Sequence, residues 1–143
     1  MNLKLKIVNN GKLPEYKTIG SSGADCFARI DSPLILKPGE RKLIPLGIAV
    51  EIPEGYEIQV RPRSGLAYKE GVTIINTPGT IDSDYRGEIH ANLINFSKED
   101  FIVNPDDRIA QIILSPVIRA EFEIVDSLSE TVRGEGGHGS TGK

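Results

Sequence analysis

The segment RKLIPLGIAVEIPEGYEIQVRPRSG, residues 41–65, carries the pattern that decides the fold. Its first half, Lys42–Ile52, is rich in aliphatic residues and ends at the turn signal Pro53-Glu54-Gly55. After this turn, Ile58 and Val60 alternate with polar neighbours. A period of two is typical of a strand with one buried and one exposed face. The segment therefore predicts short β-strands separated by a turn.

Similar patterns extend from this segment towards both ends of the chain. Leu3, Leu5 and Ile7 alternate with lysines, and apolar residues alternate with charged ones across Val117–Leu128. A short helical turn is expected only at Ser64–Glu70. Further β-rich runs are Ala24–Ile30, Leu34–Leu36, Val72–Ile75, Gly87–Phe96 and Arg108–Val117. Many short strands between Gly and Pro turns predict an all-β sandwich, barrel or jelly roll.

Length and composition predict one globular domain. The chain has 143 residues, of which 38% are hydrophobic and 26% charged. The longest stretch without a charged residue is Gly71–Ile81, eleven residues, whereas a membrane helix needs about 20. We expect no secretory signal at the N-terminus, and the single cysteine favours the reducing cytoplasm. Because the net charge is −3, a bound polyanion would be held by local arginines or a metal.

The C-terminal string RGEGGHGSTG, residues 133–142, contains five glycines. Its letters fit two nucleotide-binding patterns, G-x-G-x-x-G and a P-loop-like spacing. Both patterns require a helix directly after the glycines, and none can follow here, so neither of these nucleotide-binding folds is expected. Glycine N–H groups can nevertheless wrap an anion, with Arg133, Ser140 and Thr141 as further donors. Either a ligand-wrapping arm or a disordered linker fits this string. We expect the polar segment from Ser129 onward to be mobile without ligand.

The segment GTIDSDYRGEI, residues 79–89, gathers acidic and basic side chains in a turn between two strand-like runs. Asp82 at a strand end can orient or deprotonate an attacking water, with Asp84 and Arg86 beside it. The other interpretation is an ordinary Asp/Gly-rich hairpin turn. Because Asn76–Gly79 also has turn chemistry, the whole region is expected to form a hairpin.

Three further positions carry polar groups near strand ends. Ser64 either caps the predicted helical turn or contacts a phosphate beside Arg63. Asp25 either stabilises Arg63, accepts a hydrogen bond from metal-bound water, or makes a turn. Gln111 stands in the otherwise apolar run Ile109–Leu114 and needs a hydrogen-bond partner.

Cys26 and His90 lie in predicted strands and are better explained as packing residues than as ligands. Two histidines and one cysteine far apart in the chain make neither a zinc site nor a catalytic dyad.

The ordered set of motifs is more specific than any one of them. SSGAD, RPRSGLA, NTPGTIDSDYRG, RIAQII and RGEGGHGSTG follow one another over residues 21–142 and resemble the five motifs of the trimeric dUTPases. The resemblance implies a jelly-roll or distorted β-barrel homotrimer with active sites between subunits. It also implies Mg²⁺-assisted hydrolysis of dUTP to dUMP and diphosphate, in the cytoplasm, without nucleic-acid or membrane partners. Residues 1–129 would form the catalytic domain and residues 130–143 a flexible arm that closes over the site.

The resemblance also assigns roles to residues around the triphosphate. Asp82 would position and activate the water that attacks the α-phosphorus. Ser64 and Gly65 would contact the phosphates, Arg63 would order the phosphates or the arm, and Gln111 would hydrogen-bond nearby. Asp25 would reach the metal through water only, because phosphate oxygens and waters hold the metal in this family.

Base and sugar recognition is implied for the segment from Asn76 to Asp82, including Gly79, Thr80 and Ile81. Tyr85 would stack under the sugar and exclude a 2′-hydroxyl, and His90 would line the pocket through its backbone.

In the arm, the resemblance implies that Arg133, Ser140 and Thr141 hold the γ-phosphate and that Gly139 offers an N–H. His138 stands where the family usually has a phenylalanine that stacks on the base. An imidazole can also stack, so the sequence predicts weaker or pH-sensitive closure of the arm.

Two other functions share this fold. The dCTP deaminases and the bifunctional deaminase–dUTPases resemble one another in having a catalytic glutamate in the strand after the hairpin. This sequence has Asn92 near that place, so the acid/base group for deamination is missing. A non-catalytic trimer that binds nucleotide or a protein partner would not need Asp82 and the complete arm.

Overall fold

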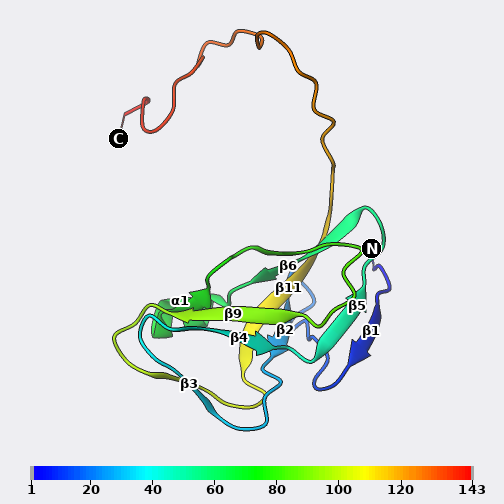
Figure 1. Cartoon of the computed structure of the whole chain (residues 1–143), viewed down its shortest axis with the longest axis vertical. Coiled ribbons are helices and arrows are strands. Elements are labelled where there is room, and N and C mark those ends of the chain that lie inside the picture. Colours follow the sequence, from blue (N-terminus) through cyan, green and yellow to red (C-terminus); the bar gives the residue numbers. More distant parts are fainter. Residues whose placement is uncertain (1, 143) are drawn as a thin grey trace.

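The structure is a computed structural model that describes residues 2–142 (Figure 1). Within this range the chain is almost entirely β, with one short helix. The elements in chain order are β1 (Lys6–Asn9), β2 (Ala24–Phe27), β3 (Leu34–Leu36), β4 (Arg41–Pro45), β5 (Ile48–Glu51), β6 (Tyr56–Arg61), α1 (Ser64–Glu70), β7 (Val72–Ile74), β8 (Gly79–Ile81), β9 (His90–Asn95), β10 (Phe101–Val103) and β11 (Arg108–Pro116).

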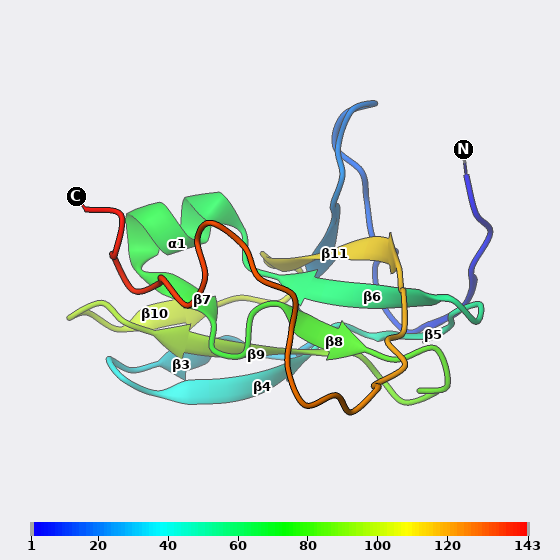
Figure 2. The same ribbon diagram turned by 90° about the horizontal axis from the view of Figure 1, so that it is seen from above.

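The strands form antiparallel sheets whose neighbours are mostly distant in sequence. One sheet has the order β2-β11-β6-β8 and another has the order β4-β9-β7. The pairs β1-β5 and β10-β3 complete the arrangement. Figure 2 shows β6 and β11 lying over the layer that contains β3, β4 and β9. The layered, crossed-over connectivity is jelly-roll-like, and the sheets do not close into a barrel, so the expected all-β fold is confirmed.

The core lies between these layers and is built from alternate strand residues. Ile58 and Val60 of β6 point into it, as the period of two predicts, while their polar neighbours face outward. Ile44 of β4 and Leu93 of β9 reach the same apolar cluster from the opposite layer. Burial of these side chains holds the strands that carry the polar motifs.

Asn95 at the end of β9 is the one fully buried polar residue among those described. Its Nδ2 donates hydrogen bonds to the carbonyl oxygens of Leu36 (2.9 Å) and Glu99 (2.7 Å). Its Oδ1 accepts a hydrogen bond from the N–H of Ser97 at 2.9 Å. Asn95 therefore joins β3 to the loop after β9, and these partners satisfy the polar atoms of its own buried side chain.

The predicted strand in Val117–Leu128 is wrong for the described chain. β11 ends at Pro116, and the following residues extend away from the body of the molecule (Figure 1). Phe122 and Ile124 have exposed fractions of 92% and 99%. An alternating segment becomes a strand only where a neighbouring strand pairs with its backbone, and the chain offers none to this segment within the described residues.

Other predicted boundaries also shift. The run Lys42–Ile52 is divided between β4 and β5, because the chain turns at Gly47, whose φ is +72°. The strand predicted from Gly87 begins at His90. At the N-terminus only Lys6–Asn9 is a strand, and its residues are exposed rather than half-buried.

The region Asn76–Asp82 is not the hairpin that its turn chemistry predicts. β7 pairs with β9, whereas β8 pairs with β6 in the other sheet. The turn between β7 and β8 is therefore a crossover between layers, and Thr77 N–H donates to the carbonyl of Ile74 at 3.2 Å within it.

Residues 2–142 include no helix that is long and apolar enough to cross a membrane.

Candidate functional site

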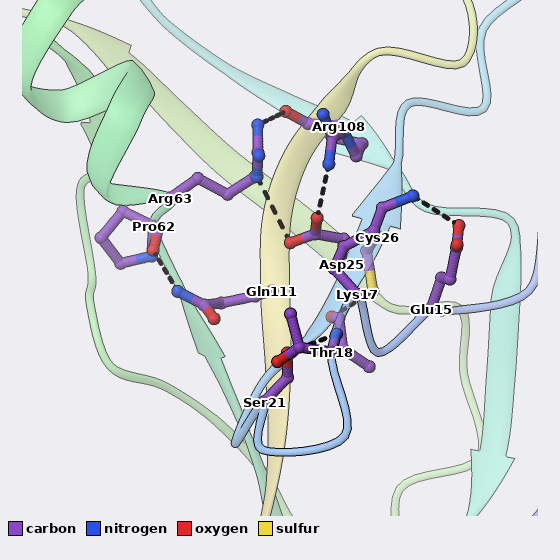
Figure 3. A network of polar contacts seen from close by, with 11 residues as sticks. Glu15, Lys17, Thr18, Ser21, Asp25, Cys26, Pro62, Arg63, Arg108 and Gln111 are labelled. Atoms are coloured by element: carbon purple, nitrogen blue, oxygen red, sulfur yellow. Dashed lines mark hydrogen bonds and ion pairs between the residues drawn. The ribbon is translucent and has the colours of Figure 1, made fainter.

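Asp25 of β2 joins two arginines from distant motifs (Figure 3). Its Oδ1 lies 3.3 Å from Nε of Arg63, and its Oδ2 lies 3.1 Å from Nη1 of Arg108. Nη1 of Arg63 also donates to the carbonyl of Arg108 at 3.2 Å. The Asp25 side chain is only 13% exposed, so both ion pairs are partly shielded from water. The prediction that Asp25 stabilises Arg63 is confirmed, and Arg108 is a second partner.

Gln111 sits at the centre of the four-stranded sheet, because β11 pairs with both β2 and β6. It lies opposite Asp25 on one side and Arg61 on the other. Its Nε2 donates to the carbonyl of Pro62 at 2.9 Å, which supplies the partner that the sequence required. A Cβ at Gly23 would overlap the Gln111 side chain, so the loop before β2 needs a glycine there.

Ser64 begins α1 beside this group, but its hydroxyl does not cap the helix. The N-cap residue is Arg63, which makes no side-chain capping bond. The capping interpretation of Ser64 is therefore wrong. Ser64 and Gly65 are exposed in the first helical turn, where backbone N–H groups have no helical acceptor. These donors lie next to Arg63 and face solvent.

Asp82 follows β8 directly and starts a tight turn. The N–H of Tyr85 donates to the carbonyl of Asp82 at 3.1 Å. Nη1 of Arg86 donates to the carbonyls of Ser83 (2.6 Å) and Tyr85 (3.2 Å), which holds the turn from outside. Asp82 is exposed and lines an open depression of about 920 Å³, with Thr80 and Arg86 at its wall.

Tyr85 is fixed by the segment that follows it. Its hydroxyl donates to the carbonyl of Glu88 at 2.9 Å, and Nδ1 of His90 lies 3.0 Å from the same oxygen. Of the residues expected to read the base, Gly79 is buried in β8, Asn76 and Thr80 are exposed, and Ile81 is half-buried.

One chain does not bring Asp82 to the arginine group. Ile81, which precedes Asp82, pairs with Ile58 near the start of β6, whereas Arg63 lies beyond the end of the same strand. Arg63 is five residue steps of extended chain beyond Ile58, which is roughly 17 Å at about 3.3 Å per step. The two halves of the expected site therefore lie at opposite ends of β6.

The glycine-rich arm lies away from both halves (Figure 1). It contains local turns. In one of them, Nε of Arg133 donates a hydrogen bond to the carbonyl oxygen of Gly136 at 2.8 Å. In another, the N–H of Ser140 donates to the carbonyl oxygen of Gly137 at 3.0 Å. The residues expected to hold the phosphates and the base are exposed there: Arg133, His138, Gly139, Ser140 and Thr141.

The described residues fit a divalent metal only if other groups supply most of its ligands. They contain no cluster of three or more His, Cys, Asp or Glu side chains that could hold an ion. Both carboxylate oxygens of Asp25 are already paired with arginines, although each oxygen can also accept a hydrogen bond from water. This donor set fits a Mg²⁺ ion that phosphate oxygens and waters carry.

Cys26 is a packing residue, as predicted. It is buried in β2, and burial raises the pKa of its thiol to about 12. The thiol is therefore protonated at neutral pH and is no nucleophile.

Sequence reasoning missed the roles of Arg108 and Glu88. Arg108 is the first residue of β11. It lies 83 residues from Asp25 in the sequence, so no local pattern could indicate their ion pair. Glu88 acts through its backbone carbonyl, a group that every residue carries, so no side-chain pattern could reveal it.

Comparisons with known proteins cover nearly the whole chain. A family model described as dUTPase matches residues 9–142. A deoxyuridine 5'-triphosphate nucleotidohydrolase from Chlamydia pneumoniae is 58% identical over 143 residues, 99% of each chain. One from Treponema denticola is 56% identical over 142 residues, again 99% of each chain.

Solved structures show the same likeness at lower identity. The dUTPase of Staphylococcus bacteriophage 80alpha with dUPNHPP superimposes with a TM-score of 0.85 at 27% identity, covering 99% of this chain and 100% of that one. A mutant dUTPase from phage phi11 of S. aureus, solved to show the coordination of a structural Mg(II) ion, has a TM-score of 0.78 at 25% identity over 87% of this chain and 98% of its own.

Proposed function

The chain belongs to the dUTPase family, and we propose that it hydrolyses dUTP to dUMP and diphosphate. The observation that carries this proposal is identity of 58% to a named nucleotidohydrolase over 99% of each chain. The reaction would lower cellular dUTP and supply dUMP for the synthesis of dTMP. The single buried thiol suits a reducing compartment, so the cytoplasm is the proposed location.

In the proposed reaction, Asp82 orients a water molecule for in-line attack on the α-phosphorus. The water oxygen forms a bond to phosphorus as the bond to the bridging oxygen of the β-phosphate breaks, and diphosphate leaves. The water proton passes to the Asp82 carboxylate, which is exposed at the end of β8 and accessible to substrate. Because an aspartate is a weak base, positioning contributes much of the rate enhancement.

The triphosphate would lie on the group around Arg63. Arg63 and Arg108 are pre-positioned by Asp25, and Ser64 and Gly65 offer a hydroxyl and backbone donors. Gln111 would hydrogen-bond the phosphates or the reacting water. When bound, Mg²⁺ would orient the phosphate oxygens and offset their charge, with Asp25 accepting a hydrogen bond from a metal-bound water.

Base and sugar would be read by the region around β8. Asn76 and the backbone of Gly79–Ile81 would bind uracil without room for a methyl group, and Tyr85 would stack under the deoxyribose. His90 would line this pocket. Support for this assignment comes from the fixed orientation of Tyr85, which is bonded to Glu88.

We also propose a homotrimer with each site assembled between subunits. The separation of Asp82 from Arg63 along β6 supports this proposal, because another copy must supply the missing half. The exposed, alternating side chains of Phe122 and Ile124 provide a second reason, since they need a neighbouring surface to be buried.

Residues 130–143 would then be the closing arm of a catalytic domain formed by residues 1–129. Arg133, Ser140 and Thr141 would hold the γ-phosphate, with the N–H of Gly139 beside them. His138 would stack on the uracil ring.

The central test is diphosphate release from dUTP, dCTP, dTTP and UTP with Mg²⁺. We expect the wild type to turn over dUTP only. The Asp82→Asn variant should hydrolyse dUTP at least about a hundredfold more slowly, because the amide cannot take the water proton. Asp100→Asn is the matched control, since Asp100 is exposed before β10 and does not line the depression that contains Asp82, so it should retain activity. Ammonia release from dCTP would favour a deaminase instead, and nucleotide binding without turnover would favour the non-catalytic trimer.

The arm has its own test. Deleting residues 131–143 should abolish most turnover while light scattering still reports a trimer. His138→Phe should raise kcat/KM for dUTP, because the phenylalanine that is usual in the family would stack on the base and close the arm more tightly. Equal kcat/KM for the two proteins would refute weaker closure of the arm by His138.

A further inference from the structure

The aromatic ring of Tyr85 folds back over the chain at Gly87. A Cβ placed on Gly87 would lie 2.9 Å from Cε2 of Tyr85 and closer still to Cζ and Oη. All three of its nearest atoms belong to the Tyr85 side chain. Such contacts are shorter than van der Waals separation, so any side chain at position 87 must displace the ring. Only glycine leaves this space open.

The carbonyl of Glu88 fixes the Tyr85 hydroxyl by accepting its hydrogen bond, and Glu88 is itself held in place. The Glu88 carboxylate accepts a hydrogen bond from the N–H of Gly47 at 3.2 Å. The next residue, Ile89, is fully buried, and its N–H donates to the carbonyl of Ile48 at 2.8 Å. The acceptor for the Tyr85 hydroxyl is therefore anchored to β5.

We infer that Gly87 is a positioning residue that sets the sugar specificity of this chain, by leaving the space in which the Tyr85 ring meets the Glu88 carbonyl. The inference rests on the proposed function, in which Tyr85 stacks under the deoxyribose. A ring displaced by a Cβ no longer closes the space where a 2′-hydroxyl would fit. Gly87 thus acts through Tyr85 and touches no substrate itself.

The test is the ratio of kcat/KM for dUTP to kcat/KM for UTP in Gly87→Ala. The backbone at Gly87 does not have a positive φ, so alanine introduces the methyl group without backbone strain. We expect the ratio to fall about tenfold or more, since misplacement by about 1 Å can cost a hundredfold. Gly20→Ala is the matched control, because a Cβ there meets no atom within 4 Å and φ is not positive. Its ratio should equal that of the wild type.

A double-variant cycle separates positioning from general damage. In a Tyr85→Ala background the ring is gone, so adding Gly87→Ala should leave the ratio unchanged. A further fall in the double variant, or an unchanged ratio in folded Gly87→Ala, would overturn the inference. If Gly87→Ala does not fold by circular dichroism, Tyr85→Phe decides instead. It removes only the bond to Glu88, and an unchanged ratio would refute the anchoring. Absence of dUTP turnover in the wild type would instead overturn the proposed function.

Discussion

Replacing Asp25 by asparagine should destabilise the fold and weaken the proposed phosphate site together. Asparagine keeps the shape of the side chain but removes its charge and turns an amide donor towards one arginine. Loss of a charge-assisted hydrogen bond costs about 2 kcal/mol for the shielded Arg63 partner. It costs about 1 kcal/mol for Arg108, whose side chain is 41% exposed. The sum is about 3 kcal/mol, or about two orders of magnitude in the unfolding equilibrium constant.

The measurement is urea unfolding followed by circular dichroism at one fixed chain concentration, because subunit association would add to apparent stability. Glu15→Gln is the matched control. Glu15 bridges directly to Asp25 through backbone hydrogen bonds of 2.8 and 3.0 Å, yet its carboxylate faces solvent beside Lys17. The same carboxylate-to-amide change there should shift the unfolding midpoint much less than Asp25→Asn does, because the pair that Glu15 makes with Lys17 is exposed to solvent.

Activity provides the second readout for Asp25→Asn. Freed from its anchor, Arg63 should lose its fixed orientation, and kcat/KM for dUTP should fall at least about tenfold. An unfolding curve for Asp25→Asn that coincides with that of Glu15→Gln would refute the reasoning, because it would mean that the two ion pairs contribute no net stability.

Three further predictions follow from buried or paired groups. Cys26, whose pKa burial raises to about 12, should have roughly one thiolate in 10,000 molecules at pH 8 and react with a disulfide reagent only after unfolding; equal rates in native and unfolded protein would contradict this. Asn95→Ala should lower the free energy of unfolding by about 3 kcal/mol, since a buried side chain loses three hydrogen bonds, one of them buried and two part-buried. Exposed Asn104→Ala should change it by less than about 0.5 kcal/mol in the same urea titration. A hydrogen bond from Lys6 lowers the pKa of Glu51 below its ordinary 4.5, so the stability from this pair is present above pH 4.5 and is lost as the pH falls below it. The melting temperatures of wild type and Glu51→Gln should therefore converge between pH 5 and pH 3, and a constant difference would disprove the assignment.

Local sequence patterns predicted the elements whose partners lie within the same chain. β6 and α1 begin and end close to the predicted residues, because the alternation and the flanking turns act over a few positions. The need of Gln111 for a partner could be predicted as well, since an amide in an apolar run must be satisfied. The same reasoning failed for Val117–Leu128, where the alternation is real but its neighbour is not in the described chain.

The order of motifs determined the family, and the period of two determined that the fold is built from half-buried strands. Only the tertiary structure decided that β7 and β8 belong to different sheets, that Asp25 also holds Arg108, and that Asp82 and Arg63 lie near opposite ends of β6. Pairing between strands depends on long-range hydrogen bonds and on burial against the other layer, and these have no signature within a short window of sequence. The side chains that carry chemistry are local features of the sequence, but the distances between them belong to the sheets.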